Sequence, residues 1–250
     1  MKWIRKVLVG LFVVLSVGGV VTNSAESDLS VLRRSGEMLF LWIAAAVVLV
    51  HTPTGVASLF MGAMIGFLSE VLGVTTGLPF GYYHYTDTLG FAIAGVPVVM
   101  LAAWMVLLAY AWSLASVITV RASYCRWVAA LIMTAFDLLI DPVAIGPLHL
   151  WTWDQSGSYY GVPLVNFAGW FVVSWIALVP LSGQRKQHPA SHLVGFAIIT
   201  FFTIHAIRSE LIVAALVGIG LLAMDVWVCW CWWMQYFVTW KPLSALRSKQ

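Results

Sequence analysis

Apolar stretches long enough to cross a lipid bilayer follow one another along almost the whole of this 250-residue chain. A membrane-spanning helix needs about 20 predominantly apolar residues. A chain in lipid must also satisfy its backbone hydrogen bonds internally, within helices or closed barrels. We predict spans at residues 4–22, 38–52, 55–73, 96–119, 127–145, 162–181, 193–208 and 211–233. The predicted fold is an all-α polytopic membrane bundle of about 8 transmembrane helices.

The composition excludes most other classes of protein. Hydrophobic residues make up 62% of the chain and charged residues only 9%, whereas a soluble domain is about half apolar and a quarter charged. The sequence has no basic run, so we expect no nucleic-acid partner, and no low-complexity linker. Residues 1–250 are therefore predicted to form a single integral membrane domain. Cys125 is isolated and Cys229 and Cys231 are two positions apart, so the sequence shows no metal or redox motif.

The basic residues predict the orientation in the membrane. With both termini in the cytoplasm, all but three of the 13 Lys and Arg residues fall on the cytoplasmic side, the exceptions being Arg33, Arg34 and Arg208. This bias follows the positive-inside rule, and we expect a multi-pass protein of the cell (inner) membrane. The first span also resembles a signal peptide that ends near Thr22–Ala25, but Asn23 occupies a position that normally carries a small residue. We expect an uncleaved anchor; cleavage would leave 7 spans.

Two carboxyl groups interrupt the fifth apolar stretch. Asp137 and Asp141 are four positions apart, so both lie on one face of a helix. An ionisable group within a bilayer costs a few kcal/mol or more and by default indicates a functional site. The alternative is that both residues only cap the outer end of the helix before Pro142.

Other uncommon polar residues gather on the same, outer side. They include Glu70 at the end of the third span, His84 and Asp154 in the outer loops, and Asn166 at the start of the sixth span. Gly66, Gly73 and Gly77 surround Glu70 and would permit close helix packing that buries it. The outer loops are rich in Tyr and Trp, which also serve as interfacial anchors. The simplest interpretation is an outward-facing basin lined by carboxylates and aromatic rings.

Three separated blocks of sequence resemble one family of membrane proteins. The blocks are Glu70-Val-Leu-Gly73 with Gly77-Leu-Pro-Phe-Gly-Tyr-Tyr-His-Tyr85, then Thr134-Ala-Phe-Asp137-Leu-Leu-Ile-Asp141-Pro142 with Trp151-Thr-Trp153, and Tyr159-Tyr-Gly-Val-Pro-Leu-Val-Asn166-Phe-Ala-Gly169-Trp170. They resemble carotenoid-biosynthesis proteins whose characterised members hydrate the end of an acyclic carotenoid, the carotenoid 1′,2′-hydratases. The resemblance covers about residues 60–175.

The resemblance implies a carbon–oxygen lyase that adds water to the terminal 1′,2′ double bond and gives a tertiary alcohol. Protonating carbon requires an acid that is still protonated at neutral pH, a form that burial favours. Aromatic faces can stabilise the resulting cation. We assign Asp137 as the acid and Asp141 or Glu70 as the base, with Asn166 positioning water. Substrate- and water-positioning candidates are Tyr82, His84, Tyr85, Trp151 and Trp153.

This chemistry requires no metal or other cofactor. The expected partners are an acyclic carotenoid that enters from the bilayer, membrane lipids and, as potential neighbours, other carotenoid-pathway enzymes.

Three alternative functions are considered. An intramembrane prenyltransferase would need a second Asp-rich motif and basic residues for a diphosphate, but the sequence has no second motif and only Arg208 nearby. A proton-coupled transporter would use intramembrane carboxylates, but the halves of the chain show no repeat. A non-catalytic lipid- or pigment-binding protein of the membrane is the third alternative, of the same standing as the other two.

Overall fold

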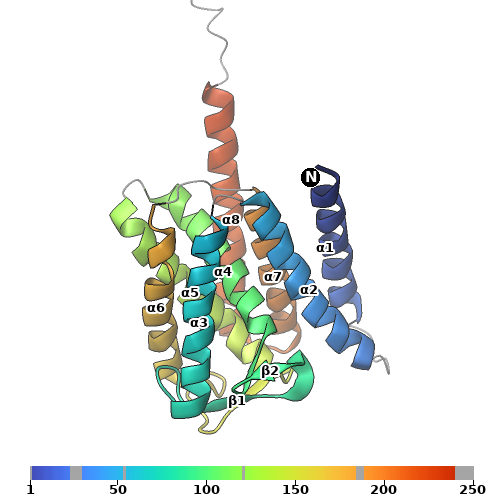
Figure 1. The fold of residues 1–250 in the computed structure, drawn as a ribbon, viewed down its shortest axis with the longest axis vertical. Coiled ribbons are helices and arrows are strands. Elements are labelled where there is room, and N and C mark those ends of the chain that lie inside the picture. The colour runs from blue at the N-terminus through green and yellow to red at the C-terminus, as the bar shows by residue number, and fades with distance from the viewer. Residues whose placement is uncertain (1, 23–29, 53–54, 120–121, 184–188, 240–250) are drawn as a thin grey trace, which may run out of the picture.

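Helices account for most of the computed structural model, which describes residues 2–22, 30–52, 55–119, 122–183 and 189–239. Within these residues the helices are α1 (Lys2–Thr22), α2 (Ser30–His51), α3 (Val56–Thr76), α4 (Val99–Ile118), α5 (Ala122–Ile145), α6 (Leu164–Ala177), α7 (Pro189–Arg208) and α8 (Ile212–Thr239). They run alternately up and down in one bundle (Figure 1). The predicted all-α membrane bundle is confirmed.

Six of these helical segments are long and apolar enough to span a bilayer, judged on the described residues. They are Val56–Thr76, Val99–Ile118, Ser123–Ile145, Leu164–Leu181, Pro189–Arg208 and Ile212–Cys231. Helix α2 contributes the shorter apolar segment Met38–His51. The segment Leu164–Leu181 includes a turn of 3₁₀-helix, η2 (Val179–Leu181), which follows α6.

Helix α4 lies at the centre of the bundle and contacts α2, α3, α5 and α7. Glycine allows two of these neighbours to approach closely, as expected where helices associate without a hydrophobic driving force. A Cβ at Gly66 would clash with the Trp104 ring, and one at Gly195 would clash with the Tyr110 ring. Large aromatic residues of α4 therefore pack directly against the backbones of α3 and α7.

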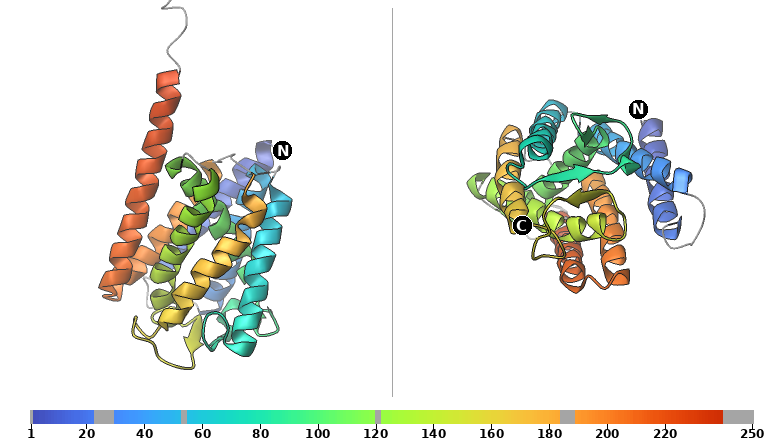
Figure 2. Two further views of the ribbon diagram at one scale, coloured as in Figure 1. Left: turned by 90° about the vertical axis from the view of Figure 1, so that its left-hand side faces the viewer. Right: turned by 90° about the horizontal axis from the view of Figure 1, so that it is seen from below.

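Two short β-ribbons and their loops close one end of the bundle (Figure 2, right). Strand β1 (Tyr83–Tyr85) pairs antiparallel with β4 (Trp151–Trp153), so that Tyr83 lies opposite Trp153 and Tyr85 opposite Trp151. Strands β2 (Ala92–Ile93) and β3 (Val96–Pro97) form the second ribbon, which follows the 3₁₀ turn η1 (Asp87–Leu89). The β1–β4 pairing connects the loop after α3 to the loop after α5.

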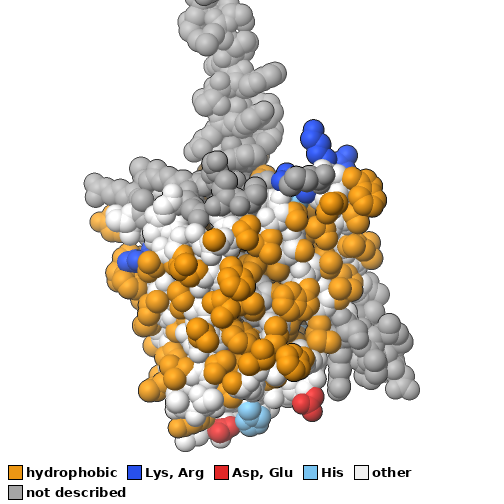
Figure 3. Space-filling model, viewed as in Figure 1, with side chains coloured by type: hydrophobic (Ala, Val, Ile, Leu, Met, Phe, Trp, Pro, Cys, Tyr) orange, Lys and Arg blue, Asp and Glu red, His pale blue; other side chains and the backbone are white. Residues whose placement is uncertain are grey.

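Basic and acidic groups lie at opposite ends of the bundle on the face that Figure 3 shows. Figure 3 shows an apolar belt, with Lys and Arg at the end where α1 begins and Asp, Glu and His at the β-ribbon end. Several of the basic residues used to predict orientation lie outside the described residues, namely Arg121, Arg185, Lys186, Lys241, Arg247 and Lys249. Most of the predicted signal cleavage motif, from Asn23 to Ala25, also lies outside them.

Candidate functional site

The carboxylate pair of α5 is buried near the β-ribbon end of the bundle. Asp137 is 1% exposed and Asp141 is 3% exposed. Helix α5 continues through Pro142 to Ile145, so neither residue caps the end of the helix. The structure therefore does not support the capping alternative considered for this pair.

The helix can pass through Pro142 because another residue replaces the hydrogen bond that proline cannot make. Proline has no backbone N–H, which leaves the carbonyl four residues earlier without its helical partner. That carbonyl belongs to Leu138, and the Tyr159 hydroxyl donates a hydrogen bond to it at 2.9 Å. Tyr159 was not among the predicted site residues, yet it supports the turn that carries both aspartates.

Asn166 joins the two aspartates. It lies in the first turn of α6, which begins directly after Pro163, and is 1% exposed. Its Nδ2 donates to Oδ2 of Asp137 and to Oδ2 of Asp141, both at 2.6 Å. One amide group therefore holds two carboxyl groups close together in a buried space.

The other carboxylate oxygens of Asp137 and Asp141, Oδ1 in each case, have different surroundings. Trp151 on β4 donates its indole N–H to Oδ1 of Asp141 at 3.2 Å. Oδ1 of Asp137 is buried and has no hydrogen-bond partner among the described residues. A buried polar atom without a protein partner is uncommon, and a bound water or a catalytic role can account for it.

Glu70 on α3 is the third buried carboxyl group, 3% exposed. Tyr83 and Tyr85 both donate to its Oε2, Tyr85 at 3.0 Å, and Trp104 donates its indole N–H to Oε1 at 3.1 Å. Burial and the neighbouring Glu70 carboxyl raise the pKa of both tyrosines well above the ordinary value. Both hydroxyls therefore stay protonated and able to donate at physiological pH.

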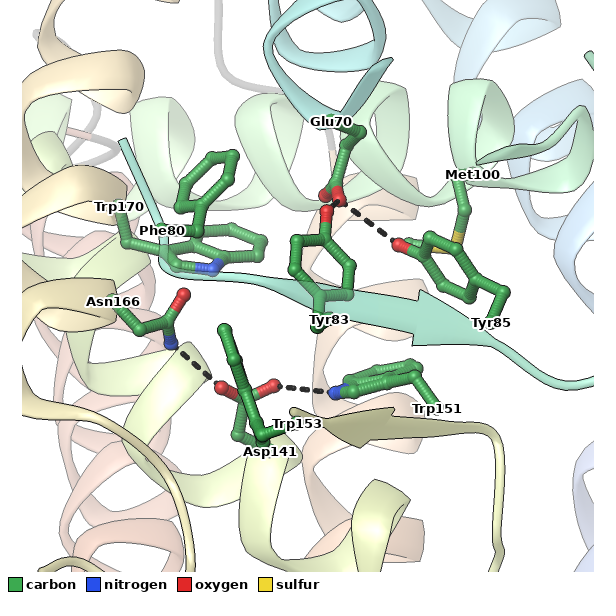
Figure 4. A pocket seen from close by; sticks show the side chains of 10 residues that line it. All are labelled: Glu70, Phe80, Tyr83, Tyr85, Met100, Asp141, Trp151, Trp153, Asn166 and Trp170. Atoms are coloured by element: carbon green, nitrogen blue, oxygen red, sulfur yellow. Dashed lines mark hydrogen bonds between the residues drawn. The ribbon is translucent and has the colours of Figure 1, made fainter. Parts of the chain in front are cut away.

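A cavity lies between Glu70 on one side and Asp141 on the other (Figure 4). The centre of a water molecule can range over about 20 Å³ within it, which is room for about one water. Six aromatic rings contribute to its wall, from Phe80, Tyr83, Tyr85, Trp151, Trp153 and Trp170, and Met100 and Asn166 complete it. The buried Trp153 indole N–H has no hydrogen-bond partner among the described residues.

The structure brings most of the predicted site residues together. Glu70, Asp137, Asp141 and Asn166 form the polar part, and Tyr85, Trp151 and Trp153 contribute rings. Tyr82 and His84 lie elsewhere: Tyr82 is 55% exposed, and His84 bonds to Asp154 at 3.0 Å and Thr152 at 2.9 Å on the outer surface.

Sequence reasoning missed several residues of the site, namely Tyr83, Trp104, Phe80, Met100 and Trp170. The alternation of side chains along a strand distinguishes Tyr83 from His84, but a strand of three residues is too short to be recognised from its sequence. In β1 this alternation places Tyr83 and Tyr85 on one face and His84 on the other.

The fold and the site define a class: a helical membrane protein in which two buried carboxyl groups, Glu70 and Asp141, and an aromatic wall enclose a small cavity near one end. A third buried carboxyl group, Asp137, is joined to Asp141 through Asn166. Residues 36–225 match the model of a family described as carotenoid biosynthesis protein. Because the match covers more than half of the sequence, the chain belongs to this family and is a membrane protein of carotenoid biosynthesis.

One curated relative has a more specific name. The chain is 30% identical over 119 residues to a protein of Haloarcula japonica named bisanhydrobacterioruberin hydratase. The aligned part covers 44% of this chain and 39% of the relative, so the chain spans well under half of that protein. This similarity supports a hydratase at the level of the family. No solved structure matches the chain.

Proposed function

We propose that this protein hydrates the terminal 1′,2′ double bond of an acyclic carotenoid to a tertiary alcohol. The observation that carries the proposal is the water-sized cavity, which has carboxyl groups on both sides and an aromatic wall. Family membership and the similarity to a hydratase support it. The substrate, the reaction and the roles of the residues are all part of the proposal.

The first step transfers a proton to carbon. Asp137 is the proposed acid, since Oδ1 is the carboxyl oxygen of the pair that no described donor occupies. The neighbouring Asp141 opposes a second negative charge, so the pair retains a proton more readily than an isolated carboxylate does. The proton bonds to the CH carbon of the double bond, and the electron deficiency is left on the tertiary carbon.

The cation that forms then meets the aromatic wall and the water. Faces of the cavity rings attract a positive charge through their quadrupoles. Water adds its oxygen to the tertiary carbon, and its extra proton passes to Asp141 or Glu70 on the two sides of the cavity. Asn166 fixes the aspartate pair and lines the cavity, which suits it to position the water.

The oxygens of Asp141 and Glu70 face N–H and O–H donors. This environment suits acid–base chemistry better than binding of the Mg²⁺ that a prenyltransferase needs, since a cation would meet those hydrogens. The cavity wall also contains no Lys or Arg for a diphosphate among its described residues. Hydration is therefore favoured over ionisation of a diphosphate.

The long apolar substrate would reach the site from the bilayer. We place the β-ribbon end at the outer face of the cell membrane, with both termini in the cytoplasm. This orientation rests on the separation of basic and acidic groups between the two ends (Figure 3) and on the positive-inside rule.

Isotopic labelling tests the reaction directly. Purified protein supplied with an acyclic carotene in detergent or liposomes should add the mass of one water to an end group. In heavy water one solvent deuterium should appear on the carbon next to the new alcohol. Labelled water, not labelled dioxygen, should supply the hydroxyl oxygen. Oxygen derived from dioxygen would instead indicate a redox hydroxylase and would overturn the proposal.

A further inference from the structure

A second polar cluster is buried between α4, α7 and α8, apart from the carboxylate cavity. Its centre is His192, whose side chain is 12% exposed and whose Nδ1 lies 2.6 Å from Oδ1 of the buried Asp225. The other ring nitrogen, Nε2, lies 2.9 Å from the hydroxyl of Ser113. Polar atoms inside a bundle of this kind are costly and indicate a site by default.

The cluster lies toward the end of the bundle opposite the β-ribbons. His192 is in the first turn of α7, and Ser113 is in the last turns of α4. The start of α7 and the last turns of α4 both lie at the end of the bundle where α1 begins (Figure 1). Ions from the aqueous phase at that end can therefore reach the cluster without crossing the bundle.

Three side chains of the cluster have the chemistry of metal ligands. Ligand atoms of His192, Asp225 and Cys229 all lie within 4.8 Å of one another. Asp225 and Cys229 are one helical turn apart on α8, which places them on the same face, and α7 supplies the histidine. Nitrogen, oxygen and sulfur ligands in a group of three are typical of zinc sites that keep a fourth position open.

The surroundings of His192 also suit a metal ligand. Metal-bound histidines usually donate their second ring N–H to a neighbouring acceptor, which fixes the orientation of the ring. Ser113 can accept that bond from Nε2, and Nδ1 then directs its lone pair toward Asp225 and Cys229.

Tyr110 provides an independent observation. It is 0% exposed and its ring packs edge-on against His192 with centroids 6.0 Å apart. Its buried hydroxyl lies beside the Asp225 carboxylate and in electrostatic range of Cys229. Tyr110 therefore adds a further polar group to the cluster and holds Asp225 near the other two ligands.

The connectivity Ser113–His192–Asp225 is also that of a serine-hydrolase triad. Such an enzyme needs free backbone N–H groups near the serine to bind an oxyanion. Ser113 lies inside α4, where the neighbouring N–H groups bond within the helix. The triad interpretation also leaves Cys229 and the Tyr110 hydroxyl without a role.

We propose that His192, Asp225 and Cys229 bind a zinc ion at the end of the bundle opposite the carboxylate site. Binding replaces the direct His192–Asp225 contact by bonds to the metal and releases the thiol proton of Cys229 to solvent. The ion connects α7 to α8. The proposal is independent of the hydration reaction, because the two sites share no residue.

Metal analysis of the purified full-length protein in detergent tests this site without a carotenoid present. After dialysis against zinc and removal of unbound ion, the wild type should retain about one zinc per chain. Cys229→Ser should bind zinc at least about tenfold more weakly than the wild type. Loss of a residue that only hydrogen-bonds to a metal ligand already lowers metal affinity about tenfold, and loss of a ligand itself should lower it by more. Ser113→Ala, which removes the outer partner, should weaken binding by about tenfold.

Cys231→Ser is the matched control, because Cys231 lies two positions away on the same helix and is outside the cluster. It should bind zinc like the wild type. With cobalt in place of zinc, the wild type and Cys231→Ser should show the near-ultraviolet absorption of a cobalt–thiolate bond, and Cys229→Ser should not. Cys229 is exposed, so its replacement by serine leaves the packing intact. Absence of bound zinc in the wild type, or equal binding by Cys229→Ser, would overturn the proposal.

Discussion

Asp137 and Asp141 share one amide donor but differ in their remaining oxygens. Asp141 receives a further bond from Trp151, whereas Oδ1 of Asp137 has no described partner. A carboxyl group that is held in place by one oxygen and has no described donor at the other can carry a proton on that second oxygen. This asymmetry agrees with the proposed roles, in which Asp137 is the acid and Asp141 is a candidate base.

Replacing either aspartate by asparagine tests these roles. Asp137→Asn and Asp141→Asn should each lower the hydration rate by about 100-fold or more, since general acid–base catalysis contributes at least that much. Both variants keep the side-chain size and should insert and purify normally. Asp87→Asn, an exposed position at the same end, should retain the wild-type rate. Turnover within a few-fold of wild type in both aspartate variants would show that the pair is structural.

At the scale of single residues, the sequence identified the carboxyl groups of the site more reliably than its aromatic rings. Glu70, Asp137, Asp141 and Asn166 stand out because polar residues are rare in apolar stretches. The segment Tyr82–Tyr85 offers several similar side chains, and the choice among them depends on a strand too short to be recognised from its sequence. Trp104 lies on an apolar helix and is identified only by the Glu70 oxygen that it contacts.

Among the elements, α5 depends on a loop residue for its last turn. Tyr159 supplies the hydrogen bond that Pro142 removes from Leu138. Burial raises the pKa of Tyr159 to about 12, so the hydroxyl remains a donor well above neutral pH. The geometry of the aspartate pair therefore depends on a residue of the connection between α5 and α6.

Tyr159→Phe should destabilise the protein by about 1 kcal/mol, because it leaves a part-buried carbonyl without a donor. An unfolded tyrosine titrates near pH 10, and the folded pKa is higher, so the contribution of Tyr159 is fully present below about pH 10. It should be lost as the pH rises toward about 12. Thermal unfolding of the two proteins at several pH values measures this difference. Tyr82→Phe, at an exposed position, is the control and should melt at the same temperature as the wild type. An unchanged melting temperature in Tyr159→Phe would show that the Tyr159 hydroxyl does not support α5.

The hydropathy pattern predicted the eight helices more reliably than their ends. Helix α2 begins at Ser30, not at residue 38, since a helix continues beyond its apolar part. Helix α4 begins at Val99, not at residue 96, because Val96–Pro97 pairs with Ala92–Ile93. The ribbons themselves were not predicted, since strands of two or three residues carry too little periodicity to be distinguished from a loop.

At the scale of the whole molecule, the face shown in Figure 3 has basic groups at the end where α1 begins and acidic groups and histidine at the β-ribbon end. The carboxylate site is buried near the β-ribbon end. The two ends of a membrane protein face different compartments, so the orientation decides from which side water and protons reach the site.

Cysteine labelling in intact cells determines this orientation. Ser158→Cys, at an exposed position in the loop after α5, should react with a membrane-impermeant reagent added outside. Gly183→Cys, exposed near the opposite end, should react only after lysis. Both are compared with the parent protein, which carries its native cysteines. The reverse pattern would place the carboxylate site at the cytoplasmic face.

The cavity between Glu70 and Asp141 has room for about one water, and it is too small to admit the branched end of a carotenoid as well. Under the proposed hydration, the two reactants could not occupy the described space together, and its walls would have to move apart when the double bond arrived. The opened cavity would have to admit the end group of the substrate while the aromatic wall still separated the new cation from bulk solvent.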